Sequence, residues 1–187
     1  MKYDVQVECP EPRWLTAEEQ QDWHAFSFAS ALLPAALEAQ MQRDSGMTHF
    51  DYRALSGLSM APDHRAQMTD LARYTGSSLS RLSNVVSRFE KRGWVTRRPD
   101  THDRRATVVT LTDDGLAVVE QAAPAHVAEV RRLVVDALSP AQFRALGDIS
   151  RTLLRAMGAP TPPRVPVDGD NGEGDDHNDG ARSRTSC

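Results

Sequence analysis

The segment 97–108, RRPDTHDRRATV, concentrates positive charge on what the sequence predicts to be one turn. Four arginines fall within nine positions, around one proline and two aspartates. Proline and aspartate favour turns. Arginine binds phosphates and base edges through its planar set of donors, and it also enters narrow minor grooves. The chemistry that this segment offers is therefore recognition of an anion by a loop.

The distribution of charge along the chain supports this interpretation. The 187 residues carry a formal net charge of −4. Residues 64–105 nevertheless contain ten Lys or Arg and four Asp or Glu, a net charge of +6, which leaves −10 on the remainder. A basic block inside an acidic chain indicates an anionic polymer as partner. The alternative is an ordinary solvated face, and the pattern of the preceding helix disfavours it.

Apolar spacing and capping residues predict a mainly helical chain around the arginine-rich turn. Helices are expected to follow the capping residues at 16, 48, 112 and 139, with Glu19 completing a capping box and glycines at 46, 93 and 158 ending helices. A short helix opening near 69 and another over 79–92 flank a tight break at 76–78. Pro34 is expected to kink or split the first helix, and Pro124 to bend the fifth. Segments 94–98 and 106–111 are rich in β-branched residues and predict a hairpin.

The predicted helix over 79–92 has one apolar face and one hydrogen-bonding face. Its apolar positions step by 3, 4 and 3 and are expected to be buried: Leu79, Leu82, Val86 and Phe89. A recognition helix must bury one face on its own domain and present the other to the major groove. The opposite face carries hydrogen-bond donors and no acid: Ser80, Arg81, Asn84, Ser87, Arg88 and Lys91.

The position of each residue along this helix predicts whether it contacts a base or a phosphate. Because the N-terminal positions of a recognition helix usually reach bases, Ser80, Arg81 and Asn84 are predicted to contact bases. Arg88 and Lys91 are predicted to reach phosphates. Ser78, at the start of the helix, is a further candidate contact.

A helix, a tight turn, a second helix and a charged hairpin in succession form a helix-turn-helix with a wing. The run MTDLARYTGSSLSRLSNVVSRFEKRGWVTRRPDTHDRRATVVTLTDDG resembles the MarR family of winged helix-turn-helix transcriptional regulators. With the flanking helices, the resemblance covers about residues 14–158. It implies a mainly α (α+β) fold with a winged lobe at 48–112 and dimerisation helices at 14–47 and 113–158. Residues 1–13 are predicted to be an irregular arm, and 159–187 a disordered acidic tail.

The resemblance also implies a function and roles for the wing. Family members are homodimers that bind pseudo-palindromic operators, usually as repressors, and many are released by a small phenolic or carboxylate-like ligand. Arg105 would enter the minor groove, and Asp103 would pair with it or with a neighbouring arginine. Phosphate contacts would come from Arg97, Arg98 and Arg104. The sequence departs from a frequent family pattern at Arg81 and Asn84, which indicates a different base preference.

Two further sets of candidates follow. The apolar stripes of the flanking helices are too extensive for a monomer and predict a two-fold interface, with these candidates: Leu33, Leu37, Leu116, Val130, Leu146, Leu153 and Met157. The residues that map to the family's ligand cleft are Trp23, Phe26, His49, Tyr52 and Arg53, although each such residue is more often core or cleft wall than a ligand contact.

Other functions have little support in the sequence. The six histidines show no metal-ligand spacing, and there is no glycine-rich phosphate loop or nucleophile motif, so no metal, cofactor or catalysis is expected. Cys9 and Cys187 lie near the two ends without a base to activate them, which argues against thiol sensing. No apolar leader or membrane span is evident, and a cytoplasmic protein is expected. An architectural winged helix that no small molecule regulates stays as the alternative.

Overall fold

The computed structural model describes residues 12–100, 103 and 105–159. Its helices are α1 (Ala17–Ser45), α2 (His49–Ser59), α3 (Met68–Thr75), α4 (Leu79–Lys91), α5 (Asp113–Val130) and α6 (Pro140–Ala156), with a short 3-10 turn η1 (Pro62–His64) and a π turn η2 (Arg131–Val135). The strands are β1 (Arg65–Gln67), β2 (Val95–Pro99) and β3 (Thr107–Leu111). The predicted mainly α fold with a small sheet is confirmed. Most of the predicted arm and tail lies outside the described residues.

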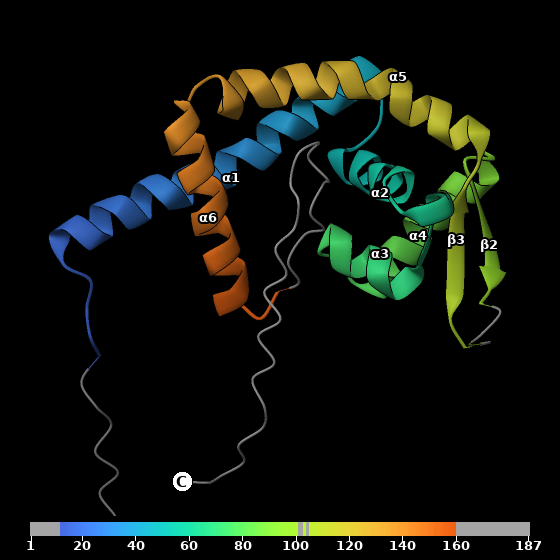
Figure 1. Cartoon of the computed structure of the whole chain (residues 1–187), viewed down its shortest axis with the longest axis horizontal. Coiled ribbons are helices and arrows are strands. Elements are labelled where there is room, and N and C mark those ends of the chain that lie inside the picture. Colours follow the sequence, from blue (N-terminus) through green and yellow to red (C-terminus); the bar gives the residue numbers. More distant parts are fainter. Residues whose placement is uncertain (1–11, 101–102, 104, 160–187) are drawn as a thin grey trace, which may run out of the picture.

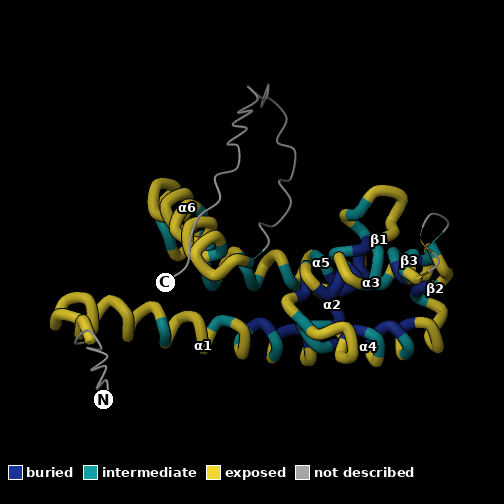
Figure 2. Tube along the Cα trace, turned by 90° about the horizontal axis from the view of Figure 1, so that it is seen from below, coloured by how far each residue is buried: buried dark blue, intermediate teal, exposed yellow. Residues whose placement is uncertain are grey.

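The elements gather into two regions that α1 and α5 connect. Figure 1 shows α2, α3, α4 and the strands at one end of the molecule, and α6 with the N-terminal half of α1 at the other. The burial pattern in Figure 2 follows this division, because the buried positions concentrate where α1 and α5 meet the winged lobe, whereas α6 and the first half of α1 are exposed. The winged lobe therefore contains the core, and the other region presents unpaired helical surface.

The helix boundaries follow the predicted capping chemistry. Thr16 Oγ1 accepts a hydrogen bond from the Glu19 N–H at 3.2 Å, and Glu19 Oε2 accepts one from the Thr16 N–H at 2.8 Å, which completes the predicted capping box. Gly93 has φ 76°, the left-handed conformation expected of a residue that ends a helix. Both α1 and α5 continue through their prolines, so Pro34 does not split α1.

The sheet is antiparallel with the strand order β1-β3-β2. The predicted hairpin is confirmed: β2 pairs with β3, with Arg97 opposite Val109. The sequence did not predict β1, which pairs with β3 from Arg65 opposite Thr110. Three residues are too few to show a period of two.

The core of the winged lobe joins α1, α2, α4 and the strands. Its largest fully buried side chains are Phe89, Met41, Leu55, Leu58, Leu82, Val86, Val95 and Val109. One predicted core position is wrong: Leu79 is 49% exposed, and Val85, at 7%, lies in the buried face instead. Leu79 is the first residue of α4 and lies at the edge of the core. The buried face of α4 is therefore formed by Leu82, Val85, Val86 and Phe89.

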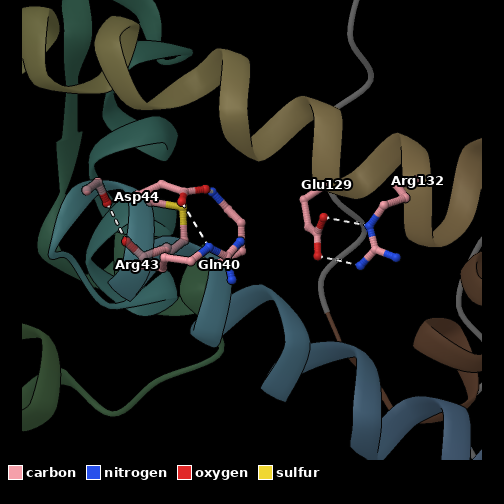
Figure 3. A network of polar contacts seen from close by, with 7 residues as sticks. Gln40, Arg43, Asp44, Glu129 and Arg132 are labelled. Carbon is pink, nitrogen blue, oxygen red and sulfur yellow. Dashed lines mark hydrogen bonds and ion pairs between the residues drawn. The ribbon is translucent and has the colours of Figure 1, made fainter.

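Polar groups accompany the packing of α1 against α5 (Figure 3). On α1, the buried Gln40 donates to Asp44 Oδ2 at 2.9 Å, and Arg43 contacts the other oxygen of the same carboxylate at 3.1 Å. Where α5 continues into η2, Arg132 of η2 donates two hydrogen bonds to Glu129 of α5. These bonds, aided by the charges of Arg132 and Arg43, lower the pKa of Glu129. Glu129 is therefore a stable anion at this junction.

Candidate nucleic-acid interface

The predicted recognition helix, α4, follows a tight turn after α3. Gly76 ends α3 with φ 63°, and Ser78 Oγ accepts the N–H of Arg81 at 3.2 Å. Ser78 is therefore the N-cap of α4, a role that fixes where the helix begins. Ser80, Asn84 and Lys91 are exposed on the side of α4 opposite the buried residues, so they keep the orientation that the sequence predicted for them.

Two arginines of α4 lie differently, because the first turn of α2 contacts them. The guanidinium carbon of Arg81 lies 4.2 Å from the centroid of the Phe50 ring. Arg88 Nη2 donates to Asp51 Oδ1 at 2.7 Å. Both arginines remain exposed overall, so part of each guanidinium is open to a partner. The sequence alone did not reveal Phe50 and Asp51, because an amphipathic stripe shows which face is buried but not which neighbour contacts its edge.

The wing begins with an arginine that is engaged within the chain. Arg97 donates from Nε at 3.0 Å and from Nη2 at 2.6 Å to the same oxygen of Glu90. Its side chain is 29% exposed. This ion pair connects β2 to the end of α4, and the phosphate contact of Arg97 stays a prediction. Arg98 is exposed and has no ion pair within the described residues.

The tip of the wing is organised by two aspartates. Asp103 Oδ1 accepts the backbone N–H of Arg105 at 2.9 Å, and Asp100 Oδ1 accepts that of Asp103 at 3.3 Å. The predicted ion pair between Asp103 and an arginine side chain is not present among the described residues, so Asp103 shapes the loop through the backbone instead. The side chain of Arg105 is left exposed. Arg104 lies outside the described residues.

A hydrogen bond connects the wing to the helix-turn-helix. Gln67, at the start of α3, donates from Nε2 to Asp100 Oδ2 at 3.0 Å. Together with the bonds between Glu90 and Arg97, this contact holds the hairpin at both sides against the helices. The exposed face of α4 and the exposed arginines of the wing therefore belong to one connected lobe.

The five candidates for a ligand cleft do not meet within one chain. Trp23 and Phe26 contact each other at 6.0 Å on the exposed half of α1. His49 and Tyr52 pack against His126 of α5 instead. Arg53 donates to the carbonyl oxygen of Tyr74 at 3.1 Å. Tyr52 is only 6% exposed and belongs to the core.

The candidates for a dimer interface also divide. Leu37 is buried and Leu116 packs against the core, so both contribute to the folding of the single chain. Leu33 and Val130 are partly buried. Leu146 and Leu153 on α6 are exposed, and so is Met157, which follows its last residue. Large apolar residues that the sequence analysis did not name as candidates are also exposed: Phe28, Leu32, Phe143 and Ile149.

Comparison with known proteins places this arrangement in a family. A MarR family model matches residues 45–106, which include α2 to α4 and β2. The crystal structure of Sco3205, a MarR family transcriptional regulator from Streptomyces coelicolor in complex with DNA, superposes with a TM-score of 0.74 at 44% identity. That similarity covers 79% of this chain and 92% of Sco3205. The chain belongs to the MarR family.

Further relatives agree with this assignment. AbsC, a MarR family transcriptional regulator from Streptomyces coelicolor, has a TM-score of 0.74 at 36% identity, with 79% of this chain and 99% of AbsC covered. The transcriptional repressor MprA of Escherichia coli (strain K12) is 30% identical over 118 residues, 63% of this chain. The matched stretch spans 66% of MprA and 51% of the repressor YetL of Bacillus subtilis (strain 168). This MarR-family chain is therefore a transcriptional regulator.

Among the described residues of this regulator, no group of three or more His, Cys, Asp or Glu is close enough to hold a metal ion. No described helix is long and apolar enough to cross a membrane. Cys9 and Cys187 lie outside the described residues.

A histidine pair between α2 and α5 makes the stability of this MarR-family fold sensitive to pH. His49 and His126 lie 5.5 Å apart, and Tyr52 lies 4.5 Å from His126. Burial lowers the pKa of both histidines, and His126 and Arg53 lower that of His49 further, while Glu38 on α1 opposes this. Both rings are therefore neutral at pH 7. Below about 6.5 the unfolded chain binds more protons than the folded chain, so acid destabilises the fold.

We expect His126→Gln to weaken this acid sensitivity. Between pH 7 and pH 5, the melting temperature of the parent should fall a few degrees further than that of the variant, as measured by circular dichroism. The matched control is His64→Gln, because His64 is exposed in η1 and lies outside both α2 and α5, and it should follow the parent. Identical falls for His126→Gln and the parent would contradict the role of the pair.

Proposed function

We propose that this regulator is a homodimeric repressor that binds a specific double-stranded DNA sequence, a pseudo-palindromic operator, and that a small phenolic or carboxylate-like ligand releases it. The observation that carries the proposal is the juxtaposition in one lobe of an α4 face of exposed donors with the exposed arginines of the wing. Such a surface offers a helix to the major groove and arginine to phosphates or the minor groove. The relative Sco3205, whose crystal structure is a complex with DNA, supports the same proposal.

The ligand part of the proposal has separate support. BpsR from Bordetella bronchiseptica, whose DNA binding is regulated by 6-hydroxynicotinic acid, is 25% identical to this chain with a TM-score of 0.62. That compound is an aromatic carboxylate with a hydroxyl group. Because the candidate cleft residues of this chain do not converge within one chain, the site would need the partner subunit to bring Trp23 or Phe26 near His49.

A mobility shift with the DNA upstream of this chain's own gene tests DNA recognition. We expect a shifted band that an excess of random duplex does not remove, and an affinity that falls with salt by about 0.9 log units per log unit for each phosphate neutralised. A phenolic carboxylate should reverse the shift. Equal competition by specific and random duplexes would favour the architectural alternative.

The dimer is supported by the apolar surface of α6 and of the first half of α1. Phe143, Ile149 and Met157 are exposed at 41%, 56% and 69%. Exposed apolar surface of this extent marks an interaction site, and helices at the end of a symmetric regulator can pair about a two-fold axis.

We expect Ile149→Glu combined with Leu153→Glu to leave a folded monomer. Two carboxylates per chain cannot be buried without partners at the interface, whereas both positions are exposed in the single chain. Sedimentation velocity should give a molecular mass near 20.7 kDa for the variant and twice that for the parent. The control is Arg151→Glu, on the polar side of α6, where Arg151 pairs with Asp148. A parent that sediments as a monomer would refute the dimer.

A further inference from the structure

The first turn of α2 contacts both arginines of the predicted recognition helix. Phe50 lies under the guanidinium of Arg81 at 4.2 Å, and Asp51 accepts from Arg88 at 2.7 Å. Arg81 and Arg88 are seven positions apart, two helical turns, so they lie on the same side of α4. Together with Glu38, Thr48 and Val85, these four residues line one cavity of about 360 Å³. Consecutive residues of one helix thus contact successive arginines of another.

The capping pattern indicates that Asp51 has a role beyond starting α2. In α1 and α6, the third residue after the cap, Glu19 or Gln142, returns its side chain to the N–H of the capping residue. Asp51 occupies the same position in α2, and Thr48 Oγ1 accepts its N–H at 2.9 Å. Its carboxylate is instead bonded to Arg88, and α2 has no complete capping box.

The two side chains of the ion pair differ in burial, as expected if Asp51 orients Arg88. The side chain of Asp51 is 10% exposed and that of Arg88 is 56% exposed. Asp51 is therefore fixed in the lobe, while Arg88 presents further N–H groups outward. A free arginine side chain keeps many rotamers and would contact any phosphate within reach. Holding it in one direction restricts the contacts that it can make.

We propose that Phe50 and Asp51 are positioning residues that aim Arg81 and Arg88, and that this turn of α2 thereby sets the base preference of the recognition helix. The proposal rests on the proposed DNA recognition by α4. Asp51 acts on specificity rather than on total affinity, since its negative charge lies close to the DNA-facing surface and opposes binding to any phosphate backbone.

The experiment measures the affinities for a selected duplex and for a random duplex by fluorescence anisotropy. The selected duplex is the sequence that the parent enriches from a random library. For Asp51→Asn, we expect the ratio of the two affinities to fall about tenfold, while affinity for the random duplex stays equal or rises. A variant that damaged the fold would lose both affinities and melt earlier. Asp70→Asn is the matched control: it removes the same charge from an exposed pair with Arg73 at 2.9 Å in α3, and its ratio should match the parent.

Two more variants make the test decisive. In an Arg88→Ala background, Asp51→Asn should change the ratio no further, because its effect passes through Arg88. If Asp51→Asn does not fold, Phe50→Leu keeps an apolar residue under Arg81, removes the ring, and should lower the ratio in the same direction. A parent without any preference would overturn the DNA recognition itself. A parent with a clear preference and unchanged ratios in Asp51→Asn and Phe50→Leu would overturn only the positioning role.

Discussion

Arg105→Ala should weaken binding to the selected duplex by about a hundredfold, if each of the two subunits loses a minor-groove contact of about 1.4 kcal/mol. The structure leaves the side chain of Arg105 exposed while Asp103 holds its backbone N–H at 2.9 Å. The loop therefore keeps its shape after the substitution, and the loss reports the guanidinium alone. Fluorescence anisotropy measures the affinity, and sedimentation should show an unchanged assembly.

Arg144→Ala is the control for the change of charge. Arg144 is exposed on α6, far along the chain from the winged lobe, so its removal should alter the affinity by less than twofold. An Arg105→Ala protein that binds as tightly as the parent would contradict the assignment of 97–108 as a DNA-contacting wing.

Gly115→Ala should destabilise the fold by about 2–3 kcal/mol, within the range of overpacked sites. A Cβ at Gly115 would lie 2.1 Å from the Trp94 carbonyl oxygen and 2.8 Å from Leu111 Cδ1. That carbonyl cannot easily withdraw, because it accepts the N–H of Thr112 at 3.0 Å. The backbone at Trp94, just before β2, and the first turn of α5 therefore lie too close together for any side chain at position 115. Thermal unfolding should show a fall in melting temperature of about 5–10 °C.

Asp114→Ala serves as the comparison for this substitution. Asp114 precedes Gly115 in the same turn of α5 but is exposed, so its loss should cost less than about 1 kcal/mol through the helix dipole. If Gly115→Ala melted at the temperature of the parent, the close packing of Trp94 on α5 would be wrong.

The elements of this fold could be predicted because each is encoded locally. The capping box of Thr16 and Glu19 determines where α1 begins and spans only four residues. A single glycine, Gly93, determines where α4 ends. The stripe of α4 and the turn residues between β2 and β3 likewise lie within short windows. The short strand β1 escaped prediction, because its pairing with β3 depends on residues more than forty positions away.

The site was predictable in its location but not in its internal contacts. The sequence placed Arg81, Arg88, Arg97 and Arg105 near one another, yet the only partner it predicted for any of them was Asp103, for Arg105 or a neighbouring arginine. Three of them have partners: Phe50 and Asp51 come from α2, and Glu90 from the last turn of α4. Which arginine faces an acid or a ring depends on the angle at which helices cross, and residue spacing within a single helix does not contain that angle.

The dimer and ligand candidates show the same limit. Leu37 satisfies the apolar spacing of α1 but is buried within the chain, whereas Phe28 and Leu32 of the same helix are exposed. An apolar stripe in the sequence indicates that a side chain is buried. It does not indicate whether the residue is buried within its own chain or against a partner subunit.

The central claim is that this MarR-family regulator recognises a specific duplex as a symmetric dimer, and selection from a library of random duplexes tests it most directly. We expect enrichment of an inverted repeat whose half-sites lie about 10–10.5 base pairs apart, or a multiple of that distance, as two recognition helices on one face of the DNA require. Recovery of no enriched sequence, or of a single half-site without symmetry, would contradict the account.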